Sequence, residues 1–472
     1  MSNINIKKTS SFYDSQALFR KKWRNKNSYY HSLIESFYKF NIPKSKKVLE
    51  IGCGTGNLLN SLEPSMGVGI DNAGEMIKIA KKDHPKLIFI KSDAHAIQIQ
   101  EKFDYIILSD MLGDIDDIQK VFEELHKTTT PQSRIIITNF NYLWEPFINL
   151  AQNMGLKMPQ PQQNWLSDYD LENLFYLSDF EIVRKGKLIL FPLNLPLISS
   201  FINKILAKLP IINNLCLIQY FIIRQINTTI APQDKSVSII IPARNEEKNI
   251  DTLIEQIPML GTSTEIIFVE GGSIDNTYTE IKKVIKKYAG KNIKLIKQKG
   301  VGKGDAVRTG FRKAKGEILM ILDADMTVPP KDLSKFYKAL IAKKGELIMG
   351  SRLIYPMENQ AMKLLNTIGN KFFSIFFSFL LDQKIKDTLC GTKVLLKDDY
   401  ITIDKNRNFF GNFDPFGDFD LIFGAAKQNL KILEIPVRYR ARIYGDTNIS
   451  RFKHGLLLLK KTIFAIKKIK CI

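Results

Sequence analysis

Two aspartates, Asp323 and Asp325, come directly after a short apolar run and carry the clearest chemical signal in this chain. The run, residues 319–322, has the composition of a buried strand, and ligands of open α/β sheets bind at the carboxyl ends of the strands. Because only Ala324 separates the two carboxylates, both can face one cation. Carboxylate oxygens are ligands that Mg²⁺ and Mn²⁺ favour when these ions bind phosphate groups. The pair therefore predicts a metal site next to a phosphorylated ligand.

Three polar loops in the same half of the chain are expected at the same sheet edge. Their polar residues are Pro242, Asn245 and Glu246, then Glu270, Ser273 and Asp275, and finally Lys303 and Arg308. The two cations suit a diphosphate, because charge-assisted hydrogen bonds to phosphate are strong. Each loop alone is equally well explained as a turn, but their order beside the aspartate pair favours one binding site.

A glycine-rich loop in the first half predicts a second site. Residues 50–56, Glu-Ile-Gly-Cys-Gly-Thr-Gly, follow an apolar run and precede a helical pattern, a context in which glycines bring the backbone close to a ligand. Asp71 ends the next apolar run, where a carboxylate can accept hydrogen bonds from both hydroxyls of a ribose. Asp93 ends the third run, within reach of an adenine amino group. A ligand that contains a nucleoside is therefore expected.

Strand and helix patterns alternate along both halves, which predicts an α/β fold with mainly parallel sheets covered on both faces. Strands are expected at 47–51, 66–70, 87–90, 103–108, 134–138, 180–190 and 215–226, and then at 237–241, 265–269, 293–297, 317–322, 346–349 and 432–437. The sixth and seventh would form an antiparallel hairpin around the apolar insertion 192–210. Residues 1–47 carry aromatic side chains at helical spacing, which predicts a helical cap.

A chain of 472 residues is too long for a single hydrophobic core. We expect a first domain at residues 1–230, a polar linker at 231–236 and a second domain at 237–450. Residues 451–472 include basic residues but no acidic ones, and their apolar residues fall on one helical face. A basic amphipathic helix is expected there.

Residues from about 25 to 230 resemble a class I S-adenosylmethionine-dependent methyltransferase with its Rossmann-like sheet. A dinucleotide-binding domain is the alternative, but its glycines are spaced GxGxxG, whereas this chain reads GCGTG. The resemblance implies S-adenosylmethionine as the cofactor, bound by Glu50, Gly52, Gly54, Gly56, Asp71 and Asp93. Where such enzymes use a base, it tends to follow the fourth strand, the region of Ser109, Asp110 and Asp114. The run 114–117 is equally well explained as the acidic start of a helix, and the methyl acceptor stays open.

Residues from about 235 to 450 resemble an inverting family 2 glycosyltransferase with the GT-A nucleotide-sugar-binding fold, within the dolichyl-phosphate mannose synthase and polyprenyl-phosphate glycosyltransferase branch. The family pattern PxxNE is present at 242–246, and VDDGSxDxT reads VEGGSIDNT at 269–277. Glu270 takes the position that contacts the nucleobase, but Gly271 replaces the second aspartate, which leaves the nucleotide open. The resemblance implies a donor site formed by Pro242, Asn245, Glu246, Glu270, Ser273, Asp275, Lys303, Asp323, Arg438 and Arg442, with Mg²⁺ or Mn²⁺ at Asp323 and Asp325.

Asp418 and Asp420 resemble the acidic pair that members of this family carry near the acceptor, and we take them as the catalytic candidates. If the acceptor is a sugar hydroxyl of a glycan, Asp418 is the expected general base. A lipid phosphate is already ionised and needs no base. In that case Asp418 and Asp420 would position the acceptor or cap a helix.

Charge and hydropathy bear on the surroundings of the protein. The formal net charge of +21 serves solubility, or it attracts nucleotide phosphates, anionic lipids or nucleic acid; nothing else supports nucleic acid, so none is expected. Four cysteines without a CxxC pair suit a reducing cytoplasm. No apolar run reaches about 18 residues, so no spanning helix is expected. The C-terminal helix and the aromatic segment 372–381 favour peripheral contact with the cytoplasmic face of a membrane. The alternative is that they pack against each other or against a partner subunit.

These features together predict a bifunctional enzyme of cell-surface glycan or glycolipid synthesis. One domain would transfer a methyl group from S-adenosylmethionine. The other would transfer a sugar from a nucleotide-sugar donor, with inversion and with a metal ion, to a lipid-phosphate or glycan acceptor. The alternative is a glycosyltransferase whose methyltransferase domain is a non-catalytic binding module. The sugar, the nucleotide and the oligomeric state stay open.

Overall fold

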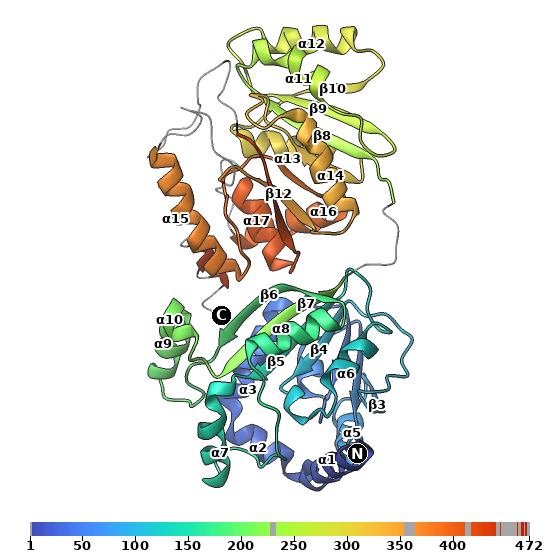
Figure 1. Cartoon of the computed structure of the whole chain (residues 1–472), viewed down its shortest axis with the longest axis vertical. Coiled ribbons are helices and arrows are strands. Elements are labelled where there is room, and N and C mark those ends of the chain that lie inside the picture. The colour runs from blue at the N-terminus through green and yellow to red at the C-terminus, as the bar shows by residue number, and fades with distance from the viewer. Residues whose placement is uncertain are drawn as a thin grey trace. The chain divides into compact units, whose positions relative to one another are not determined.

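The computed structural model describes residues 2–226, 233–353, 364–410 and 417–439, with residue 444 and a few residues near the C-terminus (460, 464–466, 468 and 469). The chain forms two compact units that divide after residue 228 (Figure 1). The predicted linker at 231–236 lies partly outside the described residues, and the predicted C-terminal helix at 451–472 lies largely outside them.

A seven-stranded sheet forms the centre of the first unit. The strands β1 to β5 are parallel, whereas β7 runs antiparallel to both of its neighbours, β5 and β6. Across the sheet the order is β3 (Ile88–Lys91), β2 (Met66–Asp71), β1 (Lys47–Ile51), β4 (Tyr105–Ser109), β5 (Arg134–Phe140), β7 (Ile218–Gln225) and β6 (Phe180–Leu188). The predicted parallel sheet with a closing antiparallel hairpin is confirmed.

Both faces of this first sheet are buried, because successive residues of a strand point to opposite faces. Val48 and Ile107 belong to one apolar core, together with Tyr38 from the predicted N-terminal cap. Leu49 and Ile106, their neighbours in sequence, belong to a second core on the other face. This alternation explains why the strands read as continuous apolar runs.

Helices cover the sheet of the first unit and extend beyond it (Figure 1). They are α1 (Ser2–Gln16), α2 (Arg20–Lys26), α3 (Ser28–Asn41), α4 (Asn57–Ser61), α5 (Gly74–Asp83), α6 (Ile118–Leu125), α7 (Glu145–Asn153), α8 (Asp168–Leu177), α9 (Ile198–Lys204) and α10 (Pro210–Asn213). The predicted helical cap corresponds to α1, α2 and α3. The apolar insertion between β6 and β7 contains α9, the 3₁₀ turn η4 (Leu206–Lys208) and α10.

The second unit is built on another seven-stranded sheet. Its order is β10 (Asn292–Lys297), β9 (Thr264–Glu270), β8 (Val237–Ala243), β11 (Ile318–Ile321), β13 (Lys393–Leu396), β12 (Leu347–Ser351) and β14 (Ile432–Pro436). The strands β8 to β11 are parallel, whereas β13 lies antiparallel between β11 and β12. The strand β13 was not predicted from the sequence, because it has only four residues and its first, Lys393, ends a polar loop.

The antiparallel direction of β13 matters for the site. Its first residue, Lys393, lies beside the carboxyl end of β11, where Asp323 and Asp325 follow the strand. The remaining elements of the second unit are the helices α11 (Ile250–Gln256), α12 (Thr277–Lys287), α13 (Lys303–Lys313), α14 (Leu333–Ile341), α15 (Leu364–Leu381), α16 (Lys397–Lys405) and α17 (Asp418–Lys427).

The aromatic segment that was considered for membrane contact lies in α15, and its described aromatic rings turn partly inward. Phe377 packs edge-on against Phe419 of α17, with ring centroids 4.6 Å apart, and Phe373 contacts the same ring at 5.8 Å. Both phenylalanines are buried. Within the described part of the chain, no helix combines the length and the hydropathy needed to span a membrane.

Candidate active sites

A cavity of about 510 Å³ lies at the carboxyl edge of the first sheet. Its volume falls in the range of small-molecule sites. Five of the six predicted cofactor-binding residues line it: Glu50, Gly52, Gly54, Asp71 and Asp93. They come from the ends of three different strands, β1, β2 and β3, which the parallel sheet brings to one edge.

Asp71 connects the glycine loop to the end of β2. One carboxylate oxygen accepts a hydrogen bond from the Gly54 backbone N–H at 2.8 Å, and the other accepts from the Ala73 N–H at 2.9 Å. Burial raises the pKa of Asp71, although these two hydrogen bonds oppose the rise. Each carboxylate oxygen has a second lone pair, so the side chain can still receive ribose hydroxyls. The residues present therefore fit a nucleoside.

Gly56, the sixth predicted cofactor-binding residue, does not line the cavity. It precedes α4 with a left-handed φ of +74°, and a Cβ at this position would overlap the ring of Phe89. The glycine is thus explained by backbone conformation and close packing.

Glu50 is a buried carboxyl group at the end of β1. Its Oε2 accepts a hydrogen bond from the Leu59 backbone N–H at 3.1 Å. Burial raises the pKa of Glu50 to about 8, an effect only partly offset by this hydrogen bond and by Arg24. Asp93 is less buried, and its Oδ1 accepts from the His95 N–H at 3.0 Å.

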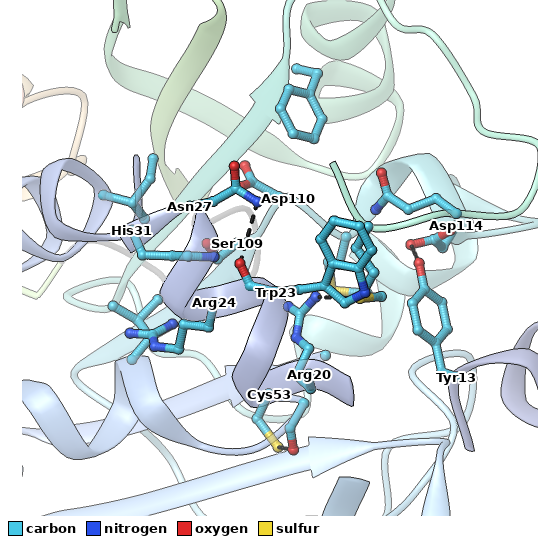
Figure 2. A pocket seen from close by; sticks show the side chains of 18 of the residues that line it. Tyr13, Arg20, Trp23, Arg24, Asn27, His31, Cys53, Ser109, Asp110 and Asp114 are labelled. Atoms are coloured by element: carbon cyan, nitrogen blue, oxygen red, sulfur yellow. Dashed lines mark hydrogen bonds between the residues drawn. The ribbon is translucent and has the colours of Figure 1, made fainter. Parts of the chain in front are cut away.

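The N-terminal helices form a wall of this cavity, which the sequence reading did not foresee (Figure 2). Tyr13 of α1 donates a hydrogen bond to Asp114 Oδ2 at 2.8 Å, and Tyr30 of α3 donates to Asp110 Oδ2. The helical spacing of aromatic residues in this segment was the available signal. Asp117, in contrast, caps α6 by accepting from the Lys120 N–H at 3.0 Å. Asp117 is thus the acidic start of a helix, whereas Asp110 and Asp114 line the cavity, and a base among them stays a prediction.

Two buried polar atoms of residues that line the cavity, Asp110 Oδ1 and Lys157 Nζ, have no hydrogen-bond partner in the described part of the chain. Burial raises the pKa of Asp110 and lowers the pKa of Lys157 to about 8, and Asp110 counteracts the latter shift. Asp110 also has a left-handed φ of +54°, which is uncommon for a residue other than glycine. These features mark the region after β4 as the polar end of the cavity.

In the second unit, the loops after β8 and β9 are joined by hydrogen bonds. The Asn245 N–H donates to Ser273 Oγ at 3.0 Å, and Asn245 Oδ1 accepts from the Ile274 N–H at 2.9 Å. The Glu246 N–H donates to Thr277 Oγ1 at 2.8 Å, while Asp275 Oδ1 accepts from the same hydroxyl at 2.5 Å. The two predicted motifs thus form one polar surface beside Pro242, which belongs to β8.

Glu270 lies buried at the end of β9, and its Oε1 accepts from the Ser273 N–H at 2.5 Å. The next residue, Gly271, is where the family pattern has an aspartate. A Cβ there would come within 2.9 Å of Gln298 Oε1. Gln298 donates to Asp305 Oδ2 at 3.0 Å, so in this chain a glutamine side chain occupies space beside the position of the missing carboxylate.

Lys303 and Asp323 form an ion pair at 2.5 Å at the carboxyl edge of the second sheet. Burial alone would lower the pKa of Lys303, but Asp323 and Asp418 raise it. Burial alone would raise the pKa of Asp323, but the Lys303 ammonium holds it below its usual range. Gly391 passes so close to both charged groups that a Cβ there would overlap them.

Asp325, two residues after Asp323, is buried and turned toward its own loop. Its Oδ1 accepts from the Thr327 N–H at 3.1 Å and from Thr327 Oγ1 at 2.8 Å. Among the described residues, no three His, Cys, Asp or Glu side chains form a metal-binding cluster. Mg²⁺ commonly takes one or two protein carboxylates and completes its shell with phosphate oxygens and water. The pair therefore fits such an ion when a diphosphate is bound.

Asp418, the candidate base, is buried and paired with Lys393 Nζ at 2.5 Å. Lys393 is itself fully buried and also donates to the Cys390 carbonyl oxygen at 2.5 Å. Asp420 lies 3.8 Å from Arg308 Nη1. Sequence reasoning missed Lys393, because the strand that carries it was not predicted.

The predicted arginines are only partly accounted for. Arg438 is exposed after β14, and Arg442 lies outside the described residues. Arg352, by contrast, is held by Asp387 through two side-chain hydrogen bonds of 2.7 and 2.8 Å. This planar pair connects the loop after β12 to the loop before β13.

The first prediction concerns the pH dependence of Glu50. Because its folded pKa lies above the ordinary value, the protonated form favours folding below about pH 4.5, and this contribution is lost as the pH rises toward 8. Relative to Glu50→Gln, the wild type should lose at most about 1.4 kcal/mol of unfolding free energy per pH unit across that window. All three tryptophans lie in the first unit, so urea titrations followed by tryptophan fluorescence measure this transition. Parallel pH profiles of the two proteins would contradict the assignment.

The second prediction concerns the buried pair of Lys393 and Asp418. Removing either partner leaves an uncompensated charge, so Lys393→Met or Asp418→Asn should each cost about 3–5 kcal/mol. The double variant should cost less than the sum of the two. The exposed pair of Arg312 and Asp404 supplies the control Asp404→Asn, which should cost less than about 1 kcal/mol. Urea unfolding followed by circular dichroism measures these changes, and additive costs would show that the pair is not coupled.

Comparisons with known proteins agree with the two sheets. Residues 42–173 match the model of a methyltransferase domain, and residues 238–403 match that of glycosyl transferase family 2. Dolichol-phosphate mannosyltransferase of Pyrococcus furiosus is 34% identical over 218 residues, which cover 45% of this chain and 59% of the relative. UDP-N-acetylglucosamine–dolichyl-phosphate N-acetylglucosaminyltransferase of Methanococcus voltae is 28% identical, covering 46% of this chain and 90% of the relative.

Solved structures that match part of this chain include a SAM-dependent methyltransferase from Thermotoga maritima. The match has 14% identity and a TM-score of 0.37, and it covers 46% of this chain and 99% of that chain. Another is glucosyl-3-phosphoglycerate synthase from Mycobacterium tuberculosis (16% identity, TM-score 0.37, 48% and 80%). The family models and the observed strand orders identify the two units. The chain contains a methyltransferase domain followed by a domain of glycosyl transferase family 2.

Proposed function

We propose that this chain is a bifunctional enzyme of cell-surface glycan or glycolipid synthesis. The first domain would transfer a methyl group from S-adenosylmethionine, and the second would transfer a sugar from a nucleotide donor to a lipid phosphate. The observation that carries the proposal is that each sheet presents buried, chemically matched side chains at its carboxyl edge. A chain that served only as a scaffold would have no reason to bury Glu50 and Asp418, or to hold the half-buried Asp323 against Lys303.

In the first domain, the side chains suit a cationic cofactor with a ribose. Asp71 would receive the ribose hydroxyls, Glu50 would face the cationic part, and Asp93 would contact the adenine amino group. S-adenosylmethionine would supply an electrophilic methyl group, so the contribution of the protein is chiefly to align the acceptor with it. The polar end of the cavity, with Asp110 and Lys157, supports placing that acceptor after β4.

In the second domain, the loops after β8 and β9 would hold the nucleoside, and Lys303 would lie beside the diphosphate. A divalent ion at Asp323 and Asp325 would neutralise negative charge on the departing nucleoside diphosphate. Lys303 is preorganised for this place, because Asp323 already holds its ammonium group. The nucleobase contact of Glu270 is proposed from its position at the end of β9.

The pairing of Asp418 with Lys393 favours a lipid phosphate over a sugar hydroxyl as the acceptor. Asp418 Oδ1 accepts a hydrogen bond from Lys393 Nζ at 2.5 Å, so this oxygen is engaged by a side chain of the protein and not directed at an acceptor hydroxyl. A phosphate nucleophile carries no proton that must be removed. The names of relatives, which include dolichyl-phosphate transferases, support the same choice. We place the enzyme at the cytoplasmic face of a membrane, where such an acceptor is found.

The metal can be tested by removing it. Transfer of a labelled sugar from a panel of nucleotide sugars to dolichyl phosphate in detergent should fall at least about 100-fold in chelator and return with Mg²⁺ or Mn²⁺. Asp323→Asn should show the same loss without rescue, whereas the exposed Asp404→Asn should behave as the wild type. Full turnover in chelator would contradict the metal assignment.

The methyltransferase assignment can be tested by cofactor binding. Calorimetry should detect S-adenosylmethionine binding to the wild-type chain, and Asp71→Ala should weaken it at least about tenfold, since a buried pair of hydrogen bonds to the ribose is lost. The exposed variant Asp83→Ala serves as the control. If the wild type does not bind at all, the first domain is a non-catalytic module and the chain is a glycosyltransferase only.

A further inference from the structure

The insertion between β6 and β7 exposes several apolar side chains and buries polar ones. Six of its apolar side chains, which we call the insertion face, are largely exposed: Leu193, Leu197, Ile198, Phe201, Ile205 and Ile211. Leu197 and Ile211 are 88% and 84% exposed, whereas Ser199 is 1% and Asn203 is 7% exposed. Isolated exposed apolar residues are ordinary, but a cluster over buried polar residues marks a contact surface.

Hydrogen bonds inside the insertion fix this arrangement. Asn203 Oδ1 accepts from the backbone N–H groups of Leu190 and Phe191, both at 2.9 Å. Ser199 Oγ accepts from the Leu195 N–H at 2.7 Å, and Asn213 Nδ2 donates to the Ala207 carbonyl oxygen at 2.7 Å. Because polar side chains satisfy the interior backbone, the apolar ones are directed outward.

Leu197 is the most exposed member of the insertion face and has a left-handed φ of +63°. This conformation is unfavourable for leucine and persists only where the surroundings impose it. The segment therefore holds an apolar side chain outward at a conformational cost, which folding alone does not explain.

The charge around the insertion face indicates the kind of partner. Residues 189–217 contain two charged side chains, Lys204 and Lys208, and no acidic residue occurs from 182 to 233. Lys204 is exposed and Lys208 is half-buried. Apolar side chains interspersed with lysines complement a membrane interface with anionic headgroups.

The insertion face continues into the mouth of the cavity. Leu193 lines the cavity as well as the surface, as does Phe147 of α7, which is 62% exposed. Figure 1 shows α9 and α10 projecting from the first unit, apart from the helices α6 and α8. An acceptor held in a bilayer would thus meet the cavity directly.

We propose that the insertion face docks the methyltransferase domain onto an anionic lipid bilayer, and that the methyl acceptor is therefore a lipid-linked molecule. The docking stands independently of the proposed function, whereas the acceptor class rests on it. Docking through this surface would orient the cavity toward the lipid.

A fluorophore at the insertion face tests the docking. In the full chain with Cys471→Ser, the cysteines that the structure describes, Cys53, Cys216 and Cys390, are buried, so Leu197→Cys can be labelled selectively with an environment-sensitive dye. Vesicles of phosphatidylcholine with about 30% phosphatidylglycerol should shift its emission to the blue. The matched site Tyr176→Cys on α8, 75% exposed in the parent chain, should not respond.

Two results would overturn the proposal. One is an unchanged emission at position 197 when vesicles are added. The other is a blue-shifted emission already in buffer, which means that the face is covered by the second domain if the shift is independent of concentration, or by a second copy if it depends on concentration. Because the readout is local, it does not depend on whether the chain transfers a methyl group.

Substitution of the face gives a second test. Leu197→Ser, Phe201→Ser and Ile211→Ser together should weaken partitioning into the anionic vesicles at least about tenfold. A matched triple on other elements, Ile88→Ser, Tyr169→Ser and Tyr176→Ser, should leave it unchanged. Because the substituted side chains are exposed, both triples should melt as the wild type does. Equal partitioning of the two triples would contradict the proposal.

Discussion

The compensation of buried charge at the carboxyl ends of the strands is the constraint on which this structure depends. Removing a charged group from water is costly unless an opposite charge or hydrogen bonds replace the solvent. In the second unit the protein supplies the opposite charges itself, through the pairs Lys303–Asp323 and Lys393–Asp418. Each pair joins two elements distant in sequence, so the same contacts that satisfy the charges also assemble the site.

The carboxyl groups in the first unit are stabilised in a different way. Glu50 is buried and Asp71 is half-buried, and both receive backbone hydrogen bonds, but within the described residues no ion pair of either is found. Burial raises the pKa values of both groups, which means that their surroundings in the protein disfavour the charged forms. A cationic ligand would relieve this cost, and the proposed cofactor is of that kind. The two sites therefore differ in whether the protein or the ligand completes the charge balance.

Much of the fold and several site residues could be predicted from the sequence, because strand periodicity and glycine motifs are local signals. The parallel direction of most strands follows from the alternation of strands and helices, and Asp71, Asp93 and Asp323 lie where the ends of parallel strands must meet. The strand that begins at Lys393 has only three apolar residues, too few to show a strand pattern. Likewise, Tyr13 and Tyr30 reach the first cavity through packing of the N-terminal helices. Helical spacing of aromatic residues predicts such a helical cap, but it does not predict the hydrogen bonds to Asp114 and Asp110, which span 101 and 80 residues.

The central claim is that Asp323 and Asp325 hold a divalent ion against a donor diphosphate. Crystals of the full chain soaked with Mn²⁺ and a nucleoside diphosphate, with data collected at a wavelength where manganese scatters anomalously, test it most directly. We expect one anomalous peak within about 2.0–2.6 Å of carboxylate oxygens from both aspartates, bridged to the diphosphate. A bound diphosphate without a peak there, with Lys303 still paired to Asp323 in place of an ion, would contradict the account.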